Sequence, residues 1–415
     1  MEEKNKNNSE NRLLSRFLRY VAIETTSDDA SATQPSTQCQ FDLLKLLRDE
    51  LREMGLEPTL DENGYLTATV PANIDNDVPT VAFIAHVDTS PDASGKDVKP
   101  QKVENYDGGD IVLNKTKNIV LSPKDYPELG NYIGQTIITS DGTTLLGADD
   151  KAGVAEIMTA VQHLLAHPEL KHGNVKIAFT PDEEIGRGVE RFDVREFAAD
   201  YAYTMDGGPI GELEYENFNA ASATISVEGV NIHPGEAKGK MLNSMLVAME
   251  FDAMLPCHER PAFTDGYEGF FHLTSIKGDV ENTTMHYIVR DHDSDKFQHK
   301  KDLIFKAADF LNAKYGKRVS VVVTDQYRNM REMVEPHFFI VERAMTAMRM
   351  AGIEPVVKPI RGGTDGANLS FMGLPCPNIF AGGHNFHGRF EYVPLQSMEK
   401  AVEVILNIIG LFAAE

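Results

Sequence analysis

Short runs of apolar residues alternate with longer stretches of helical periodicity along most of this 415-residue chain. The runs 80–85, 175–180 and 201–205 have the length and composition of strands that are buried on both faces. Alternation over 65–70 predicts a further strand. Apolar residues recur at helical spacing over 13–23, 39–54 and 154–165, and a last helix closes the chain. Strands and helices in this order predict an α/β domain.

The pattern changes between about residues 219 and 325 to strand, helix, strand, strand, helix, strand. The six segments are 220–228, 239–255, 270–278, 284–290, 294–315 and 318–324. This is the βαββαβ order of a ferredoxin-like unit. We therefore expect a smaller domain, 217–326, inserted into a discontinuous larger domain made of 1–216 and 327–415.

The connecting segments complete this outline. Residues 92–142 are rich in Gly, Pro, Asn and Asp and predict an extended loop and hairpin region. After the inserted domain we expect a helix over 336–351 and strands over 354–359 and 377–381.

The net charge of −23 disfavours a nucleic-acid partner, because a phosphate-binding face needs clustered Lys and Arg. Cys39, Cys257 and Cys376 stand far apart with no CxxC pair, so they predict buried free thiols rather than disulfides or a thiolate zinc site. Neither a signal-peptide pattern nor a membrane-spanning run is visible. We expect a cytoplasmic protein with no membrane partner.

Acidic and imidazole side chains follow each predicted buried strand, and others flank the helix at 154–165. In open α/β sheets the carboxyl ends of the strands are where ligands bind. Carboxylates and imidazoles suit zinc, and an Asp can bridge two ions. The candidates for one shared site are His86, Asp88, Asp149, Asp150, Glu183, Glu184, Asp206 and His387.

Two of these pairs also have simpler explanations. Asp149 and Asp150 lie where a helix begins, and an Asp at that position commonly caps the helix and does nothing more. Glu183 and Glu184 could be two solvated charges on a loop.

A set of motifs in a fixed order resembles the tripeptide aminopeptidases of the two-zinc aminopeptidase and carboxypeptidase superfamily. The matching stretches are His86-Val87-Asp88, Thr143 to Gly153, Thr180 to Gly186, Met205 to Gly208, Ile232 to Gly235, Arg290-Asp291, Arg361 to Ala367 and His387-Gly388. The resemblance implies a mixed-sheet zinc-exopeptidase catalytic domain with an inserted ferredoxin-like α+β lid domain.

The resemblance also implies a ligand set for two zinc ions per chain. Asp149 would bridge the ions, His86 and Asp206 would complete one site, and Glu184 and His387 the other. The peptide bond after the bridging Asp is cis in the superfamily.

Catalytic roles follow from the same resemblance. Asp88 would hydrogen-bond the second nitrogen of the His86 imidazole and so orient it. Glu183 would act as the general base that takes a proton from the attacking water and delivers it to the departing amine.

Three residues are implied to contact the substrate. Arg290 and Arg361 would hold its C-terminal carboxylate, and His233 of the lid would help to polarise the scissile carbonyl. Arg290 could instead pair with Asp291 or Asp293, and His233 could be an ordinary turn histidine.

Two further features of the sequence concern the metal ligands and phosphate binding. His384 departs from the superfamily pattern, in which an aromatic residue commonly precedes the Asn-aromatic-His run, and it could compete with His387 as a ligand; His387 is preferred because Gly388 follows it. The glycine-rich loop 361–366 lacks the Lys-Ser/Thr ending of a P-loop, so we do not expect phosphate binding.

The expected activity is zinc-dependent release of the N-terminal residue from tripeptides, with small peptides as the partners. Lid closure predicts hinges near 214–219 and 325–329, and the lid is also the candidate surface for a homodimer. The alternatives on the same scaffold are a dipeptidase, a carboxypeptidase or an N-acyl-amino-acid deacylase. A catalytically silent, zinc-stabilised binding protein is the alternative from another class.

Overall fold

The computed structural model describes residues 2–414, with side chains from Arg12 onward. The chain forms two compact units. The larger unit contains residues 1–215, 332–358 and 364–415, and the smaller unit contains residues 216–331 and 359–363. The sequence placed the inserted domain at 217–326 and did not anticipate the return of the chain to the smaller unit at 359–363.

The larger unit is built on an eight-stranded sheet. Its strands, in spatial order, are β1 (Thr59–Leu60), β2 (Leu66–Val70), β8 (Val175–Thr180), β3 (Val81–His86), β9 (Tyr201–Gly207), β16 (Asn378–Phe380), β10 (Glu212–Glu214) and β15 (Val356–Val357). β8, β3, β9 and β16 are parallel, whereas β2 and β10 join them antiparallel. The sheet is therefore mixed, which confirms the predicted fold class.

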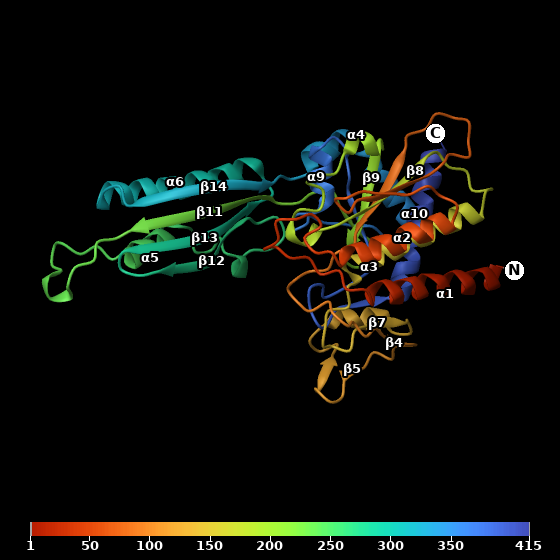
Figure 1. The fold of residues 1–415 in the computed structure, drawn as a ribbon, viewed down its shortest axis with the longest axis horizontal. Helices are drawn as coiled ribbons and strands as arrows, with labels where there is room; N and C mark the ends of the chain where they lie inside the picture. Colours follow the sequence, from red (N-terminus) through yellow and green to blue (C-terminus); the bar gives the residue numbers. More distant parts are fainter. Residues whose placement is uncertain (1, 415) are drawn as a thin grey trace. The chain divides into compact units, whose positions relative to one another are not determined.

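The three predicted buried strands, β8, β3 and β9, lie side by side at the centre of this sheet; Figure 1 labels β8 and β9. Every residue of β3 is buried, as its continuous apolar run predicts. His86 of β3 pairs with Thr180 of β8, and Ile84 pairs with Thr204 of β9. Because these strands are parallel, their carboxyl ends meet at one edge of the sheet.

Helices pack around the sheet and two small sheets extend the unit. The helices assigned mainly to this unit are α1 (Glu2–Val21), α2 (Gln40–Glu53), α3 (Ala148–Ala166), α4 (Val194–Phe197), α7 (Arg331–Val334), α8 (Phe339–Met350), α9 (Asp365–Phe371) and α10 (Leu395–Ala413). The small sheets are β4 (Gln101–Val103), β7 (Ile137–Thr139) and β17 (Tyr392–Pro394), and the hairpin of β5 (Ile111–Asn114) and β6 (Ile119–Leu121). The hairpin confirms the prediction for 92–142.

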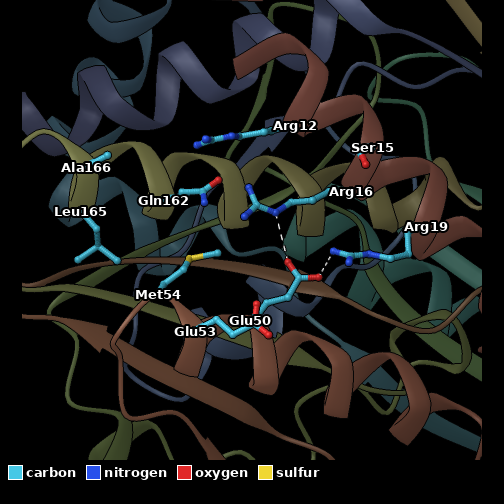
Figure 2. A pocket seen from close by; sticks show the side chains of 10 residues that line it. All are labelled: Arg12, Ser15, Arg16, Arg19, Glu50, Glu53, Met54, Gln162, Leu165 and Ala166. Atoms are coloured by element: carbon cyan, nitrogen blue, oxygen red, sulfur yellow. Dashed lines mark hydrogen bonds and ion pairs between the residues drawn. The ribbon is translucent and has the colours of Figure 1, made fainter. Parts of the chain in front are cut away.

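A buried ionic network joins α1 to α2 and α3. Figure 2 shows Glu50 of α2 reaching Arg16 and Arg19 of α1, with 3.2 Å between Arg16 Nε and Glu50 Oε2. The Tyr20 hydroxyl donates to the same carboxylate at 2.8 Å, and Arg16 Nη1 donates to Thr159 of α3 at 3.3 Å. Arg16, Arg19 and Glu50 line a cavity of about 750 Å³. The charges of Arg16 and Glu50 neutralise each other in this cavity. These contacts hold α1 against α2 and α3.

The smaller unit has the predicted ferredoxin-like topology. Its antiparallel sheet has the order β12 (Phe270–Gly278), β13 (Asn282–Asp291), β11 (Asn219–Glu228), β14 (Val319–Tyr327). Helices α5 (Ser244–Met254) and α6 (Ser294–Tyr315) pack against it (Figure 1). Side chains such as Ile225, Phe251, Tyr287 and Leu311 form a core within this unit. The βαββαβ prediction is confirmed.

Several sequence-based expectations need correction. The helix expected at 239–255 begins at Ser244, because the Asn243 side chain caps it by accepting from Met245 N at 2.9 Å. The strand expected at 354–359 is only Val356–Val357. Cys376 is buried as predicted, but Cys39 is half-buried and Cys257, just beyond the end of α5, is exposed. Within residues 2–414, no helix combines the length and the apolar content that crossing a membrane requires.

Candidate active site

The two adjacent aspartates at the start of α3 point to different partners. The buried Asp150 carboxylate accepts from the backbone N–H of Gly153 at 3.2 Å and of His86 at 3.3 Å, so it caps the helix. Asp149 keeps non-helical angles (φ −83°, ψ 105°) and its side chain faces the imidazoles described next. The Asp149–Asp150 peptide bond is cis, as expected.

Asp149 lies between two imidazoles that come from distant parts of the chain. Its Oδ1 is 2.9 Å from His86 Nε2 and its Oδ2 is 3.3 Å from His387 Nε2. His86 Nε2 also lies 3.4 Å from Asp206 Oδ1, and His387 Nε2 lies 2.8 Å from Glu184 Oε2. The structure thus brings together the five residues expected to bind metal, with one carboxylate shared between two His-containing halves.

Two overlapping groups have atoms close enough to hold a metal ion. They are His86, Asp149 and Glu184, and His86, Asp150 and Asp206, with the ligand atoms of each group within 4.8 Å of one another. The second group includes Asp150, which the sequence analysis names as a candidate for the shared site without assigning it to either zinc ion. His387 belongs to neither group, although it contacts two of the same carboxylates.

The electrostatics of this cluster fit a divalent cation. Glu184 Oε1 is buried and has no hydrogen-bond partner among the described residues. Burial and the nearby Asp149 raise the pKa of Glu184 to about 8, and burial likewise raises the pKa of Asp206 to about 6. Hydrogen bonds to Asp149 and Glu184 raise the pKa of His387 to about 11. A cation would stabilise these crowded carboxylates in their ionised form.

Asp88 connects His86 to the turn that carries the two glutamates. Its Oδ1 lies 3.2 Å from His86 Nδ1, and its carboxylate accepts from the backbone N–H of Glu183 at 3.0 Å and of Glu184 at 3.2 Å. Asp88 is fully buried. It therefore fixes both the imidazole of His86 and the position of the glutamate turn.

Glu183 lies at the start of the turn Glu183–Ile185, directly before Glu184. Burial, with Asp206 as the leading neighbouring charge, raises the pKa of its carboxyl well above the usual value. A carboxylate in such surroundings has a high affinity for a proton, which is the property that a general base needs.

Sequence reasoning missed three buried acids that support these residues. Asp182 accepts from Ser36 N and Gln40 Nε2, both at 2.7 Å, and anchors the glutamate turn. Asp365 accepts from Thr180 Oγ1 at 2.8 Å at the end of β8. Glu391 accepts from three backbone amides of the loop before α3. Asp182 and Asp365 lie within the matched stretches Thr180 to Gly186 and Arg361 to Ala367, which could have pointed to them, whereas no matched stretch contains Glu391.

His384 has a structural environment rather than a ligand-like one. Its Nε2 is 2.7 Å from the Tyr132 hydroxyl, and its ring stacks on Tyr392 with 4.6 Å between centroids. Burial lowers the pKa of His384 to about 4. These contacts favour His387 as the ligand.

The three expected substrate residues all belong to the smaller unit. Arg290 Nη1 donates to the Arg361 carbonyl at 2.9 Å, and Arg290 Nε is buried with no partner among the described residues. Neither Asp291 nor Asp293 contacts the Arg290 guanidinium; Asp291 lies 3.7 Å from Lys300 Nζ instead.

The guanidinium of Arg361 is already engaged, because it donates to the carbonyls of Gly266 at 2.6 Å and Glu268 at 3.1 Å. His233 is exposed, and its Nδ1 accepts from Gly235 N at 3.2 Å within a turn.

Comparison with known proteins identifies relatives over nearly the whole chain. The model of "Peptidase family M20/M25/M40" matches residues 142–410. A peptidase T from Alkaliphilus oremlandii is 62% identical over 405 residues, covering 97% of this chain and 99% of the relative. A peptidase T from Geobacillus thermodenitrificans is 60% identical over 402 residues, covering 96% and 98%.

Solved structures share the fold at lower sequence identity. The aminopeptidase PepT from Bacillus cereus superposes with a TM-score of 0.78 at 23% identity, covering 98% of this chain and 99% of that chain. The Bacillus subtilis YXEP protein, described as a dinuclear metal-binding peptidase from the M20 family, gives a TM-score of 0.67 at 15% identity, with 98% of each chain covered.

Proposed function

The chain belongs to peptidase family M20/M25/M40, and from that premise we propose that it is a zinc-dependent aminopeptidase that releases the N-terminal residue from tripeptides. Relatives named peptidase T, at about 60% identity over nearly full length, support this proposal. The observation that carries it is Asp149, whose two oxygens lie 2.9 and 3.3 Å from the imidazoles of His86 and His387. A carboxylate in this position suits two ions that share a ligand.

The proposed ligands of two zinc ions are Asp149, His86, Asp206, Glu184 and His387, with Asp150 close enough to take part. When bound, the ions would acidify a water molecule and withdraw electron density from the scissile carbonyl.

The chain's own residues then move the proton and hold the ligands in place. Glu183 takes a proton as water attacks the carbonyl carbon, and it delivers that proton to the amine as the C–N bond breaks. Asp88 keeps His86 in one orientation through Nδ1, 3.2 Å away.

Arg290 is our principal candidate for binding the substrate's C-terminal carboxylate. Its Nε is buried and has no hydrogen-bond partner in the part of the chain that the structure describes, and a guanidinium can bind a carboxylate through two N–H groups. Arg361 donates to loop carbonyls and accepts from Arg290 at 2.9 Å, so we assign it mainly to holding Arg290 in place. His233 is proposed to polarise the scissile carbonyl. The smaller unit would serve as the lid.

A substrate panel tests this proposal. The zinc-loaded protein should release the N-terminal residue from trialanine at least about tenfold more efficiently, in kcat/KM, than from dialanine or tetra-alanine, the factor that 1.4 kcal/mol of differential binding provides. Trialanine amide should be a poorer substrate because Arg290 loses its anionic partner.

Other products would contradict the proposal in identifiable ways. Preference for dialanine would indicate a dipeptidase, and release of the C-terminal residue would indicate a carboxypeptidase. Preference for N-acetylalanine would indicate a deacylase. A protein that binds zinc and cleaves none of these compounds would indicate a binding protein.

A further inference from the structure

Glu391 lies outside the ligand set but is tied to it by three hydrogen bonds. Its Oε2 accepts from Leu146 N at 2.7 Å and Gly147 N at 2.8 Å, and its Oε1 accepts from Asp149 N at 3.1 Å. The side chain is 1% exposed. A single buried carboxylate thus binds most of the loop that ends in the bridging aspartate.

This loop depends on Glu391 for its backbone hydrogen bonds. Gly147 has a positive φ of 84° and Asp149 is not helical, so their amides do not take part in the regular bonding of α3. Buried amides need acceptors. Glu391 provides them, although it lies 242 to 245 residues further along the chain.

The same short loop carries both Glu391 and His387. An antiparallel bridge between His384 and Tyr392 closes it, with backbone bonds of 2.9 and 3.1 Å. The Glu391 amide donates to the Gly388 carbonyl at 3.2 Å, and Gly388 directly follows His387. His387 Nε2 in turn lies 3.3 Å from Asp149 Oδ2. One loop therefore contacts Asp149 twice, at its side chain through His387 and at its amide through Glu391.

We propose that Glu391 is a positioning residue that fixes the bridging aspartate Asp149 relative to the ligand His387. This inference rests on the proposed two-metal function. A glutamate suits this position because three N–H donors require an acceptor with both oxygens available, and an ionised carboxylate offers both.

The variant Glu391→Gln tests the role while keeping the size of the side chain. The amide group of Gln retains one acceptor oxygen and directs N–H groups at a backbone N–H. The matched control is Glu156→Gln: Glu156 is also fully buried and lies on α3, but neither of its oxygens has a hydrogen-bond partner among the described residues.

Three readouts are compared for wild type and both variants. Competition with a chelator measures zinc affinity, the visible absorption of the Co²⁺-loaded protein reports ligand geometry, and trialanine hydrolysis gives kcat and KM. For Glu391→Gln we expect zinc affinity to fall about 10- to 100-fold, as for other residues that orient metal ligands. We also expect an altered Co²⁺ spectrum and a lower kcat with little change in KM, and wild-type values for Glu156→Gln.

Unchanged zinc affinity and an unchanged Co²⁺ spectrum in Glu391→Gln would overturn the proposal. If the wild-type protein bound zinc but did not cleave trialanine, the proposed substrate would be wrong, whereas the metal measurements would still decide the role of Glu391.

If the Glu391→Gln chain does not fold, hydrogen exchange of the wild-type protein tests whether the three amides are hydrogen-bonded as proposed. The amides of Leu146, Gly147 and Asp149 should then exchange slowly, as buried hydrogen-bonded groups do. Exchange at the rate of exposed loop amides would overturn the proposal.

Discussion

Asp88 shows how one buried side chain can organise several functional groups. Its carboxylate contacts His86 Nδ1 at 3.2 Å and accepts from the amides of Glu183 and Glu184. The imidazole proposed as a metal ligand and the proposed proton carrier are therefore held by the same two oxygen atoms. Such buried polar contacts are stabilising only when every group finds a partner, which is the case for Asp88.

The proposed base can be tested by removing its charge. In Glu183→Gln the side chain keeps its shape but can no longer accept a proton, so kcat for trialanine should fall about 10²- to 10⁴-fold while the zinc content is retained. Steady-state kinetics and metal analysis measure both quantities. Glu190→Gln is the control, since the Glu190 side chain is 57% exposed and lies 3.7 Å from Arg187. Activity within twofold of wild type would rule out Glu183 as the base.

His384 predicts a pH dependence of stability. Burial lowers its pKa to about 4 in the folded protein, against about 6.5 when unfolded. The unfolded chain thus binds more protons between these values, so the stabilisation is complete above pH 6.5 and is lost as the pH falls towards 4.

Urea unfolding at pH 7 and pH 5 measures this effect. Between the two pH values the free energy of unfolding of the wild type should fall by about 2 kcal/mol more than that of His384→Gln. The reason is that the imidazole binds a proton at pH 5 only in the unfolded wild-type chain. Equal losses in the two proteins would show that His384 titrates normally.

At the scale of elements, the site depends on how closely α3 approaches β9. A Cβ atom on Gly153 of α3 would lie 2.0 Å from the Met205 carbonyl oxygen, and Met205 precedes the proposed ligand Asp206. Only glycine permits this contact, because real Cβ atoms do not approach a backbone so closely. The close packing places Asp149, at the start of α3, beside the end of β9.

Gly153→Ala should therefore push the helix away from the strand. We expect a loss of about 1–3 kcal/mol in the free energy of unfolding, typical of overpacking, together with weaker zinc binding. Gly410→Ala in α10 is the control, because apart from the neighbouring backbone of α10 itself no described heavy atom lies within 4 Å of the added Cβ. That variant should be neutral or gain up to about 1 kcal/mol from helix propensity. Urea unfolding that showed no loss for Gly153→Ala would contradict the close approach.

At the scale of the whole molecule, the proposed ligands and the proposed substrate residues belong to different units. His86, Asp149, Glu184, Asp206 and His387 lie in the larger unit, although 301 residues separate the first from the last in sequence (387 minus 86). Arg290, Arg361 and His233 lie in the smaller unit, which has its own core. Metal binding and carboxylate binding should therefore be separable by mutation.

Zinc should stabilise one unit selectively. A ligand at 100 times its dissociation constant adds about 2.7 kcal/mol to the state that binds it, so zinc should raise the unfolding temperature of the larger unit and leave that of the smaller unit unchanged. Differential scanning calorimetry with zinc and with chelator measures both transitions. Asp149→Asn should show a much smaller shift. A parallel shift of both transitions would contradict this independence.

Local sequence patterns predicted the parts of the fold that depend on short-range periodicity. The continuous apolar runs predicted β3, β8 and β9, and the rule that ligands bind at strand ends pointed to His86 and Asp206. The strand and helix order of the smaller unit was likewise visible, because alternation and helical spacing are properties of neighbouring residues. The start of the helix at Ser244 was predicted five residues too early, since a cap depends on a single side chain, here Asn243.

The sequence by itself determined the strands, the helices, the inserted unit and, through its ordered motifs, the set of residues expected at the metal site. Only the tertiary structure decided the partner of each buried polar side chain. Asp150 caps α3, whereas Asp149 faces the imidazoles. His384 contacts Tyr132, and Glu391 holds the loop before α3. The physical reason is that periodicity is encoded within a few residues, whereas the partner of a buried polar group is set by packing between segments that lie hundreds of residues apart.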